Sequence, residues 1–186
     1  MKSFSIKKKK SIHLKKDEIK EICKLKNSFW KYGIKKNLEW FKDNIEDNDI
    51  HIIMKYDKKI IGYNLLRIRN VFEGSKKKPF YYFDTLIIHK KFRGKKLSNK
   101  ILKYNNKIFN KKKIRGFLIC KKETQTLYEK LGWKKLINSK FSIKGKVQKK
   151  NFVGMINSHK KFRSKQKSIY YLNLIYKKAE LFEVTN

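Results

Sequence analysis

The stretch FRGKKLS, residues 92–98, joins an apolar segment to a segment with helical spacing, and this setting suits phosphate binding. Exposed backbone amides at the start of a helix donate hydrogen bonds to anions, and the helix dipole favours negative charge there. The amides from Arg93 to Ser98 would form such a site, and Gly94 is free to take the backbone angles of the turn. Taken alone, the stretch also fits an ordinary strand-to-helix turn that binds no ligand.

The segments around this turn predict a mixed sheet with helices packed on it. Leu97, Ile101, Tyr104 and Ile108 have the spacing of an apolar helix face, and the β-branched segment before the turn is typical of a strand. In chain order we expect a strand at residues 4–14, helices at 17–30 and 36–45, a two-stranded hairpin at 50–71 and a loop at 73–79. A long strand at 80–89, a helix at 97–109, a strand at 114–120, a helix at 124–132, a strand at 133–136 and a final hairpin at 139–156 follow.

The charge of the chain is large but says little about a partner. The formal net charge is +36, yet only five of the 51 basic residues are arginine, and Lys, Asn and Ile make up 84 of the 186 residues. Such extremes follow the codons of an AT-rich genome. Phosphate-reading proteins favour arginine because its planar fork binds two oxygens at once. A solvated lysine surface therefore explains the charge better than a dedicated nucleic-acid face.

Length and composition set further bounds. A chain of 186 residues that is 40% hydrophobic and 14% aromatic can bury the core of one domain. Two cysteines are too few for a disulfide scaffold, and the four histidines lack the spacing of a metal site. The N-terminus has no continuous apolar segment, and no apolar run reaches the length of a membrane span. We therefore expect a soluble, cytoplasmic protein without a bound metal.

Two motifs, found in this order with a strand between them, resemble the GNAT acyltransferase superfamily. In IIHKKFRGKKLS, Arg93 takes the family's Gln-or-Arg position, Lys96 the position of its required glycine, and Ser98 that of its Gly or Ala. The stretch LYEKLGW, residues 127–133, matches the family's Leu-Tyr, two to three variable residues, Gly and an aromatic residue. The resemblance covers about residues 50–137.

The resemblance implies an α/β fold with a GNAT-like central mixed, mostly antiparallel sheet and helices on both faces. It places the acyltransferase domain at residues 1–156, with residues 157–186 as a C-terminal extension packed on the same domain. It also implies acetyl-CoA as the acyl donor, with its pyrophosphate on the turn. The residues that it assigns to acetyl-CoA binding are Leu86, Ile87, Ile88, Arg93, Gly94, Lys95, Lys96, Leu97 and Ser98.

The family also supplies roles in catalysis. Its strands before and after the turn splay apart to admit the pantetheine arm, so that the amide of Ile88 would donate to the thioester carbonyl oxygen. Tyr128 falls on the family's tyrosine, whose hydroxyl protonates the departing thiolate. The Asn and Ala that often precede this tyrosine are Lys122 and Gln125 here. A tyrosine that only packs on the sheet is the structural alternative.

Asp84, on the strand before the turn, is the candidate general base for the acceptor amine. Strand alternation would place Asp84, Leu86 and Ile88 on one face, where the carboxylate could line the acceptor cleft. A carboxylate bonded to a neighbouring lysine or to the backbone is an equal alternative.

The acceptor is predicted from a looser likeness. The stretches RGKKLS and GFLICKKETQTLYEKLGW look somewhat like the aminoglycoside 2'-N-acetyltransferase branch, which predicts a small-molecule amine such as an amino sugar. A peptide or protein N-terminus is the alternative. The competing class is a binding protein for nucleic acid or anionic surfaces, for which residues 149–167 interleave aromatic and basic side chains. Whether the chain forms a homodimer stays open.

Overall fold

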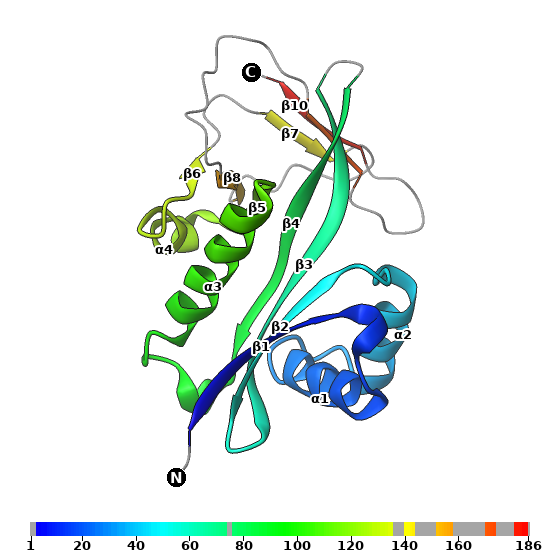
Figure 1. The fold of residues 1–186 in the computed structure, drawn as a ribbon, viewed down its shortest axis with the longest axis vertical. Coiled ribbons are helices and arrows are strands. Elements are labelled where there is room, and N and C mark those ends of the chain that lie inside the picture. The colour runs from blue at the N-terminus through cyan, green and yellow to red at the C-terminus, as the bar shows by residue number, and fades with distance from the viewer. Residues whose placement is uncertain are drawn as a thin grey trace. The chain divides into compact units, whose positions relative to one another are not determined.

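The computed structural model describes residues 3–73, 76–135, 140–143, 152–157, 170–173 and 181–185. The chain divides into two compact units, which are described separately: Met1–Arg67 with Asp84–Asn105 form unit 1, and Ile68–Phe83 with Asn106–Asn186 form unit 2. Figure 1 shows the helices and strands. The strands are β1 Phe4–Lys10, β2 Ile50–Tyr56, β3 Lys59–Glu73, β4 Lys76–Ile88, β5 Arg115–Lys121, β6 Lys134–Lys135, β7 Lys140–Ile143, β8 Phe152–Asn157, β9 Tyr170–Asn173 and β10 Leu181–Thr185.

The helices follow the predicted spacing closely. They are α1 Lys16–Asn27, α2 Ile34–Asn44, α3 Leu97–Lys112 and α4 Gln125–Glu129, with short 3-10 turns at Ser11–His13, Lys90–Phe92 and Lys122–Thr124. Asp17 and Glu18 lie in the first turn of α1, where the helix dipole favours acidic groups. The side chain of Glu18 accepts a hydrogen bond from the backbone amide of Lys15, at 3.2 Å, which fixes the start of this helix.

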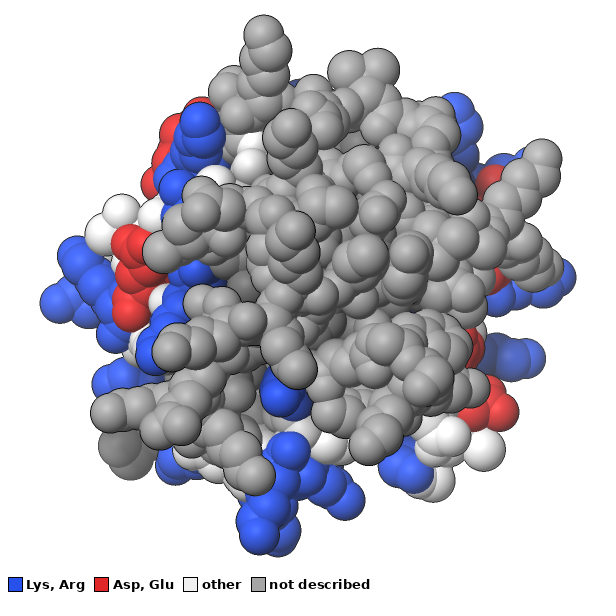
Figure 2. Space-filling model, turned by 90° about the horizontal axis from the view of Figure 1, so that it is seen from above, with Lys and Arg blue, Asp and Glu red and all other residues white. Residues whose placement is uncertain are grey.

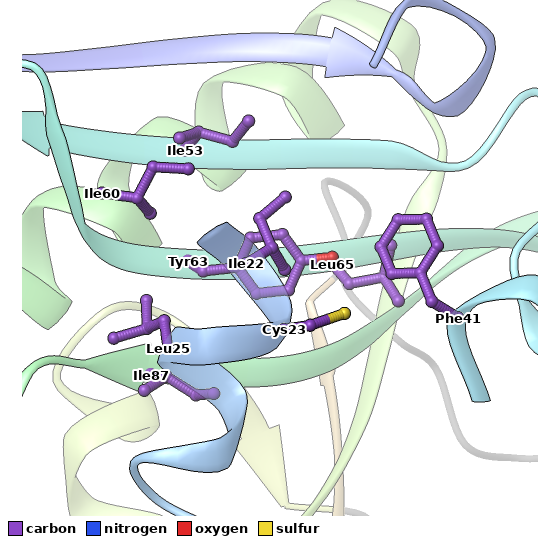
Figure 3. Packing of buried hydrophobic residues seen from close by; sticks show 9 residues of the cluster. All are labelled: Ile22, Cys23, Leu25, Phe41, Ile53, Ile60, Tyr63, Leu65 and Ile87. Atoms are coloured by element: carbon purple, nitrogen blue, oxygen red, sulfur yellow. The ribbon is translucent and has the colours of Figure 1, made fainter. Parts of the chain in front are cut away.

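In unit 1, helices cover both faces of the sheet. Strand β2 pairs antiparallel with β1 on one side and with β3 on the other. Helices α1 and α2 pack on one face, where their side chains meet Ile53, Tyr63 and Ile87 in the hydrophobic cluster of Figure 3. On the other face a side chain at Gly62 would meet Ile88 and, from α3, Ile101. Strands β2 and β3 are therefore buried on both sides, whereas β1 has no buried residue.

Unit 2 is built around a parallel strand pair and an aromatic core. Residues Phe80–Tyr82 of β4 pair parallel with Arg115–Phe117 of β5, and β8 pairs antiparallel with both β5 and β6. A side chain added at Gly116 would lie 2.8 Å from the ring of Phe109 and 3.0 Å from that of Trp133. Glycine is therefore required there by the close approach of the two rings.

The sheet is mixed and mostly antiparallel, as predicted: β4 and β5 pair in parallel, whereas β1 with β2, β2 with β3, and the pairs made by β8, β9 and β10 are antiparallel. Two local expectations were wrong. The loop predicted at residues 73–79 is largely strand, since β4 begins at Lys76. The final hairpin predicted at 139–156 does not form: β8 lies between β5 and β6, and β7 pairs with β10. The run of buried residues in β8 is typical of an interior strand. The hairpin was predicted because the two segments are close in the sequence, and sequence proximity does not show that a strand lies inside the sheet.

The predicted C-terminal extension, residues 157–186, contributes two described strands. Strand β9 pairs antiparallel with β3, and β10 pairs antiparallel with β9 and β7. The stretch 149–167, proposed for nucleic-acid contact, lies outside the described residues except for β8.

Candidate active site

The turn between β4 and α3 is tied to the end of its strand. The backbone amide of His89 donates to the carbonyl of Ile61 at 2.8 Å, and the Nε of Arg93 donates to the carbonyl of Ile88 at 3.1 Å. Leu97, the first residue of α3, is buried and holds the other end of the turn. These contacts fix both ends and leave the residues between them exposed.

The backbone amides inside the turn are open. Within the described chain, the amides of Gly94, Lys95 and Lys96 have no backbone acceptor. The turn takes left-handed angles twice, at Gly94 with a φ of 78° and at Lys96 with a φ of 54°. No acidic side chain lies in the first turn of α3, so nothing there repels an anion. Open amides at a helix start, without a competing carboxylate, fit a pyrophosphate group.

The left-handed backbone of Lys96 explains why the resembled family has a glycine at this position. A left-handed residue with a side chain costs about 1–2 kcal/mol, which glycine avoids. Lys96 is exposed, and its left-handed backbone places it before the first right-handed turn of α3. The chain keeps the turn geometry with a lysine in place of glycine.

Strand β4 contains an irregularity that the sequence did not reveal. Thr85 has a φ of 50°, an unusual angle for a β-branched residue, and it breaks the alternation of side chains along the strand. Ile87 packs in the cluster beneath α1 and α2, whereas Ile88 lies on the face towards Ile101 of α3. The carboxylate of Asp84 lies on the α2 side, next to Arg67. The expected common face of Asp84 and Ile88 is therefore wrong.

Two buried asparagines hold this irregularity in place. The Nδ2 of Asn64 donates to the backbone carbonyl of Asp84 at 2.7 Å, and the Nδ2 of Asn105 donates to the Oδ1 of Asn64 at 2.7 Å. Both asparagines are fully buried. The Asn64 side chain thus gives the carbonyl of Asp84 a hydrogen-bond donor directly beside Thr85. Sequence reasoning missed both residues, although an asparagine inside the apolar run IIGYNLLRI was a usable signal.

The carboxylate of Asp84 is already partly engaged. Its Oδ1 accepts from the hydroxyl of Thr85 at 3.0 Å, and its Oδ2 lies 3.7 Å from a guanidinium nitrogen of Arg67. Arg67 is 4% exposed, and a second guanidinium nitrogen donates to the carbonyl of Asn44 in α2 at 3.1 Å. The charged partner of Asp84 in the structure is thus a buried arginine, and the Asp84 side chain keeps 23% of its surface exposed.

A buried lysine stands near this group. Lys26 is 5% exposed, and its ammonium lies 3.4 Å from the centroid of the Trp40 ring. Burial lowers the pKa of Lys26 from 10.5 to about 8, although the nearby carboxylate of Asp84 works in the opposite direction. In a chain with so many lysines, nothing in the sequence marked this one.

A second buried polar chain runs through unit 1. The hydroxyl of Ser11 lies 2.8 Å from Nε2 of His51, and Nδ1 of His51 lies 2.8 Å from the hydroxyl of Tyr63. Burial lowers the pKa of His51 to about 3, so the imidazole is neutral at pH 7. The hydrogen bonds at both ring nitrogens identify His51 as a structural core histidine.

Tyr128 belongs to unit 2 and lies in its aromatic core. The ring packs edge-on against Phe83, at 5.9 Å between centroids, and against Trp133, at 6.2 Å. Tyr128 is 8% exposed, and burial raises its pKa well above the usual value for tyrosine. Its hydroxyl therefore stays protonated through the physiological pH range and can act only as a proton donor.

The predicted residues thus fall into two groups. Asp84, the end of β4 and the turn lie in unit 1, and Tyr128 lies in unit 2. The cavity found in unit 1, of about 410 Å³, contains none of them; it is lined by Ser3, Ser5, Lys7, Lys9, Glu18, Ile53, Lys55, Asp57 and Lys58. Among the described residues, no group of three or more His, Cys, Asp or Glu side chains is placed to hold a metal ion. None of the described helices has the length and apolar character needed to cross a membrane.

Comparison with known proteins bears on the family. The sequence profile described as Acetyltransferase (GNAT) domain matches residues 17–155. A search of curated proteins found no match.

Solved structures of acyltransferases have the same fold. An acyl-CoA N-acyltransferase from Pseudomonas aeruginosa matches with a TM-score of 0.63 and 11% identity, over 84% of this chain and 100% of that one. An aminoglycoside 6'-N-acetyltransferase complexed with coenzyme A matches with a TM-score of 0.62 and 12% identity, over 81% and 96%. The ribosomal-protein-S18-alanine N-acetyltransferase from Escherichia coli matches with a TM-score of 0.60 and 9% identity, over 86% and 98%. Their names point to different acceptors, and the 2'-N-acetyltransferase branch is not singled out.

Proposed function

This chain belongs to the GNAT acetyltransferase family, and on that premise we propose that it moves the acetyl group of acetyl-CoA to a primary amine of a small molecule such as an amino sugar. Membership makes it an acyl-CoA N-acyltransferase. The observation that carries the proposal is the turn from Arg93 to Ser98, in which the open amides of Gly94, Lys95 and Lys96 and two left-handed residues suit a pyrophosphate.

In this proposal the end of β4 and the turn bind acetyl-CoA. The amide of Arg93 donates to the carbonyl of Lys90 at 3.3 Å, so the amides from Gly94 to Ser98 hold the pyrophosphate beside Arg93. The backbone of Leu86, Ile87 and Ile88 contacts the pantetheine arm. The amide of Ile88 donates to the thioester carbonyl oxygen, where negative charge develops as the amine attacks. The bond between the carbonyl carbon and sulfur then breaks, and the hydroxyl of Tyr128 protonates the departing thiolate.

We assign to Asp84 the role of accepting the proton that the amine loses, because its carboxylate keeps 23% of its surface exposed, although it does not share a face with Ile88. Asp84→Asn removes the base and keeps the shape of the side chain, so turnover should fall most at low pH, where free amine is scarce, and less as pH rises. The measurement is the pH-rate profile of both proteins with one amine. A mutant profile that overlays the wild type would leave Asp84 as a structural partner of Arg67 alone.

The surroundings of Asp84 favour an acceptor that carries a single positive charge. Arg67 and Lys26 both lie close to this carboxylate, and the chain carries a formal net charge of +36. A polycationic aminoglycoside would therefore be repelled. A peptide or protein N-terminus is the alternative acceptor. Release of CoA thiol with a panel of amino sugars, polyamines and short peptides separates these classes.

The competing function is binding of nucleic acid through lysine. Figure 2 shows Lys and Arg side chains at several places around the visible margin, with Asp and Glu among them. Binding driven by such charges falls steeply as salt rises, because it releases counterions. Saturable binding of acetyl-CoA that persists at moderate salt supports the enzyme. The absence of any thermal stabilisation by acetyl-CoA at that salt would count against it.

A further inference from the structure

Three aromatic side chains meet beside the β4–α3 turn, and the chemistry described above leaves them without a role. They are Phe4 of β1, Tyr56 of β2 and Phe92, which directly precedes Arg93; we call them the aromatic cluster. Ring centroids lie 4.8 Å apart for Phe4 and Tyr56, and 5.4 Å apart for Tyr56 and Phe92. Figure 1 shows the N-terminal end of β1 at the same end of unit 1 as the start of α3.

The aromatic cluster is open to water. Phe4 is 43% exposed, and Tyr56 and Phe92 are half-buried. The rings are also tilted or perpendicular to one another, with Phe4 at 88° to Phe92, and so they do not stack face to face. Such a surface offers the face and the edge of a ring to a flat ligand.

Two lysines from the start of α3 lie over these rings. The ammonium of Lys95 is 5.7 Å from the centroid of Phe92, and that of Lys100 is 5.6 Å from the centroid of Phe4. Within the part of the chain that the structure describes, neither ammonium forms a salt bridge with a carboxylate. Contact with the rings holds both cations near the cluster and leaves their charge available to an anion.

Coenzyme A matches this combination of groups. Its adenosine is joined directly to the pyrophosphate and carries a further phosphate on the 3' oxygen. A pyrophosphate on the turn thus brings a flat base and an extra anion next to Phe92. We propose that the aromatic cluster binds the adenine ring and that Lys95 and Lys100 bind the 3'-phosphate. This proposal rests on the proposed function, because it takes the turn to hold the pyrophosphate.

The phosphate half is tested with 3'-dephospho-CoA. Calorimetry at moderate salt gives the dissociation constants of CoA and of 3'-dephospho-CoA for the wild type and two double variants. We expect the wild type to bind CoA roughly tenfold more tightly than 3'-dephospho-CoA. Lys95→Gln with Lys100→Gln should abolish that preference. The matched control, Lys103→Gln with Lys107→Gln, removes the same charge from exposed positions further along α3 and should keep it.

The adenine half is tested with Phe4→Leu. Leucine keeps an apolar side chain and removes the ring, so the affinity for 3'-dephospho-CoA should fall about fivefold. The affinity for CoA should fall by at least as much, because Lys100 also loses its contact with the Phe4 ring. Tyr32→Leu is the control, because Tyr32 is 66% exposed and has no ring contact among the described residues. It should bind both ligands as the wild type does.

The outcomes separate the two proposals. If the wild type binds CoA and all variants keep both its affinity and its preference for the 3'-phosphate, the adenosine site is overturned and the acetyltransferase proposal stands. If the wild type binds CoA without preferring it over 3'-dephospho-CoA, the assignment of Lys95 and Lys100 is overturned. If the wild type shows no saturable binding of CoA at all, both proposals fail together.

Discussion

The turn from Arg93 to Ser98 is shaped by its backbone, whereas Tyr128 is positioned by the packing of its side chain. Within the turn, Gly94, Lys95 and Lys96 are exposed and have open amides, and Gly94 and Lys96 take left-handed angles. Tyr128 is buried against Phe83 and Trp133. A group that donates amides needs particular backbone angles, and a group that donates a side-chain proton needs fixed neighbours. Substitutions should therefore act on binding at the first place and on stability or rate at the second.

The largest effect should come from Trp133→Ala in the aromatic core. Trp133 is 2% exposed and packs against Phe83, Phe109 and Tyr128. Truncating a buried aromatic side chain typically costs about 3–5 kcal/mol. We expect the lower end, because Nε1 of Trp133 has no hydrogen-bond partner among the described residues and its loss is cheap. Urea unfolding measures the difference in the free energy of unfolding between variant and wild type. A loss of stability below about 1 kcal/mol would show that packing does not position Tyr128.

The next effect should come from Tyr128→Phe, which removes the hydroxyl and keeps the packed ring. Positioned acids contribute about 10²- to 10⁴-fold, and a thiolate leaves readily near neutral pH, so we expect a fall in kcat of about 100-fold. The KM for acetyl-CoA should change little, as for an interaction made in the transition state. Release of CoA thiol is measured on protein that circular dichroism shows to be folded. A near-wild-type kcat, with chemistry shown to be rate-limiting, would remove Tyr128 from the mechanism.

A smaller effect, on binding, is expected for Gly94→Val. Gly94 has a φ of 78°, and a Cβ added to it would have nothing within 4 Å, so the substitution meets no neighbour and acts through the backbone. Valine is strongly disfavoured at such angles and would distort the turn. The affinity for acetyl-CoA should fall about tenfold, given a strain on the order of 1–3 kcal/mol, while the protein stays folded. Unchanged affinity by calorimetry would count decisively against this turn.

The smallest effect is expected for Lys96→Gly. Glycine relieves the left-handed strain at this position and loses more conformational freedom on folding, so the two contributions nearly cancel. Both stability and affinity for acetyl-CoA should stay close to those of the wild type, with affinity within about threefold. A tenfold loss of affinity, larger at low salt, would show instead that the ammonium of Lys96 binds the pyrophosphate.

Periodicity predicted the helices and most strands because it records which face of an element is buried. The stripe Leu97, Ile101, Tyr104 and Ile108 placed α3 on the sheet, and the spacing in residues 17–30 gave α1. Periodicity does not show which other strand a given strand pairs with. The hairpin expected at residues 139–156 failed for that reason, since β8 pairs with β5 and β6.

The residues of the site could be predicted from the sequence only where they belong to a recognisable motif. The turn and Tyr128 carry such motifs, and their assigned roles remain predictions. Thr85 carries none, because a β-branched residue is among the least expected at a positive φ, and so the faces of Asp84 and Ile88 were misassigned. Asn64 and Asn105 escaped notice because their partners, a strand carbonyl and each other, lie far apart in the sequence.

The central claim, that the turn binds the pyrophosphate of CoA, is tested most directly by amide hydrogen exchange. Open amides at a helix start exchange rapidly, and a bound anion that accepts their hydrogen bonds slows them. We predict that saturating CoA slows exchange at residues 94–98 and that pantetheine, which lacks the pyrophosphate, does not. Saturable binding of CoA by calorimetry, with exchange at residues 94–98 unchanged, would contradict the account.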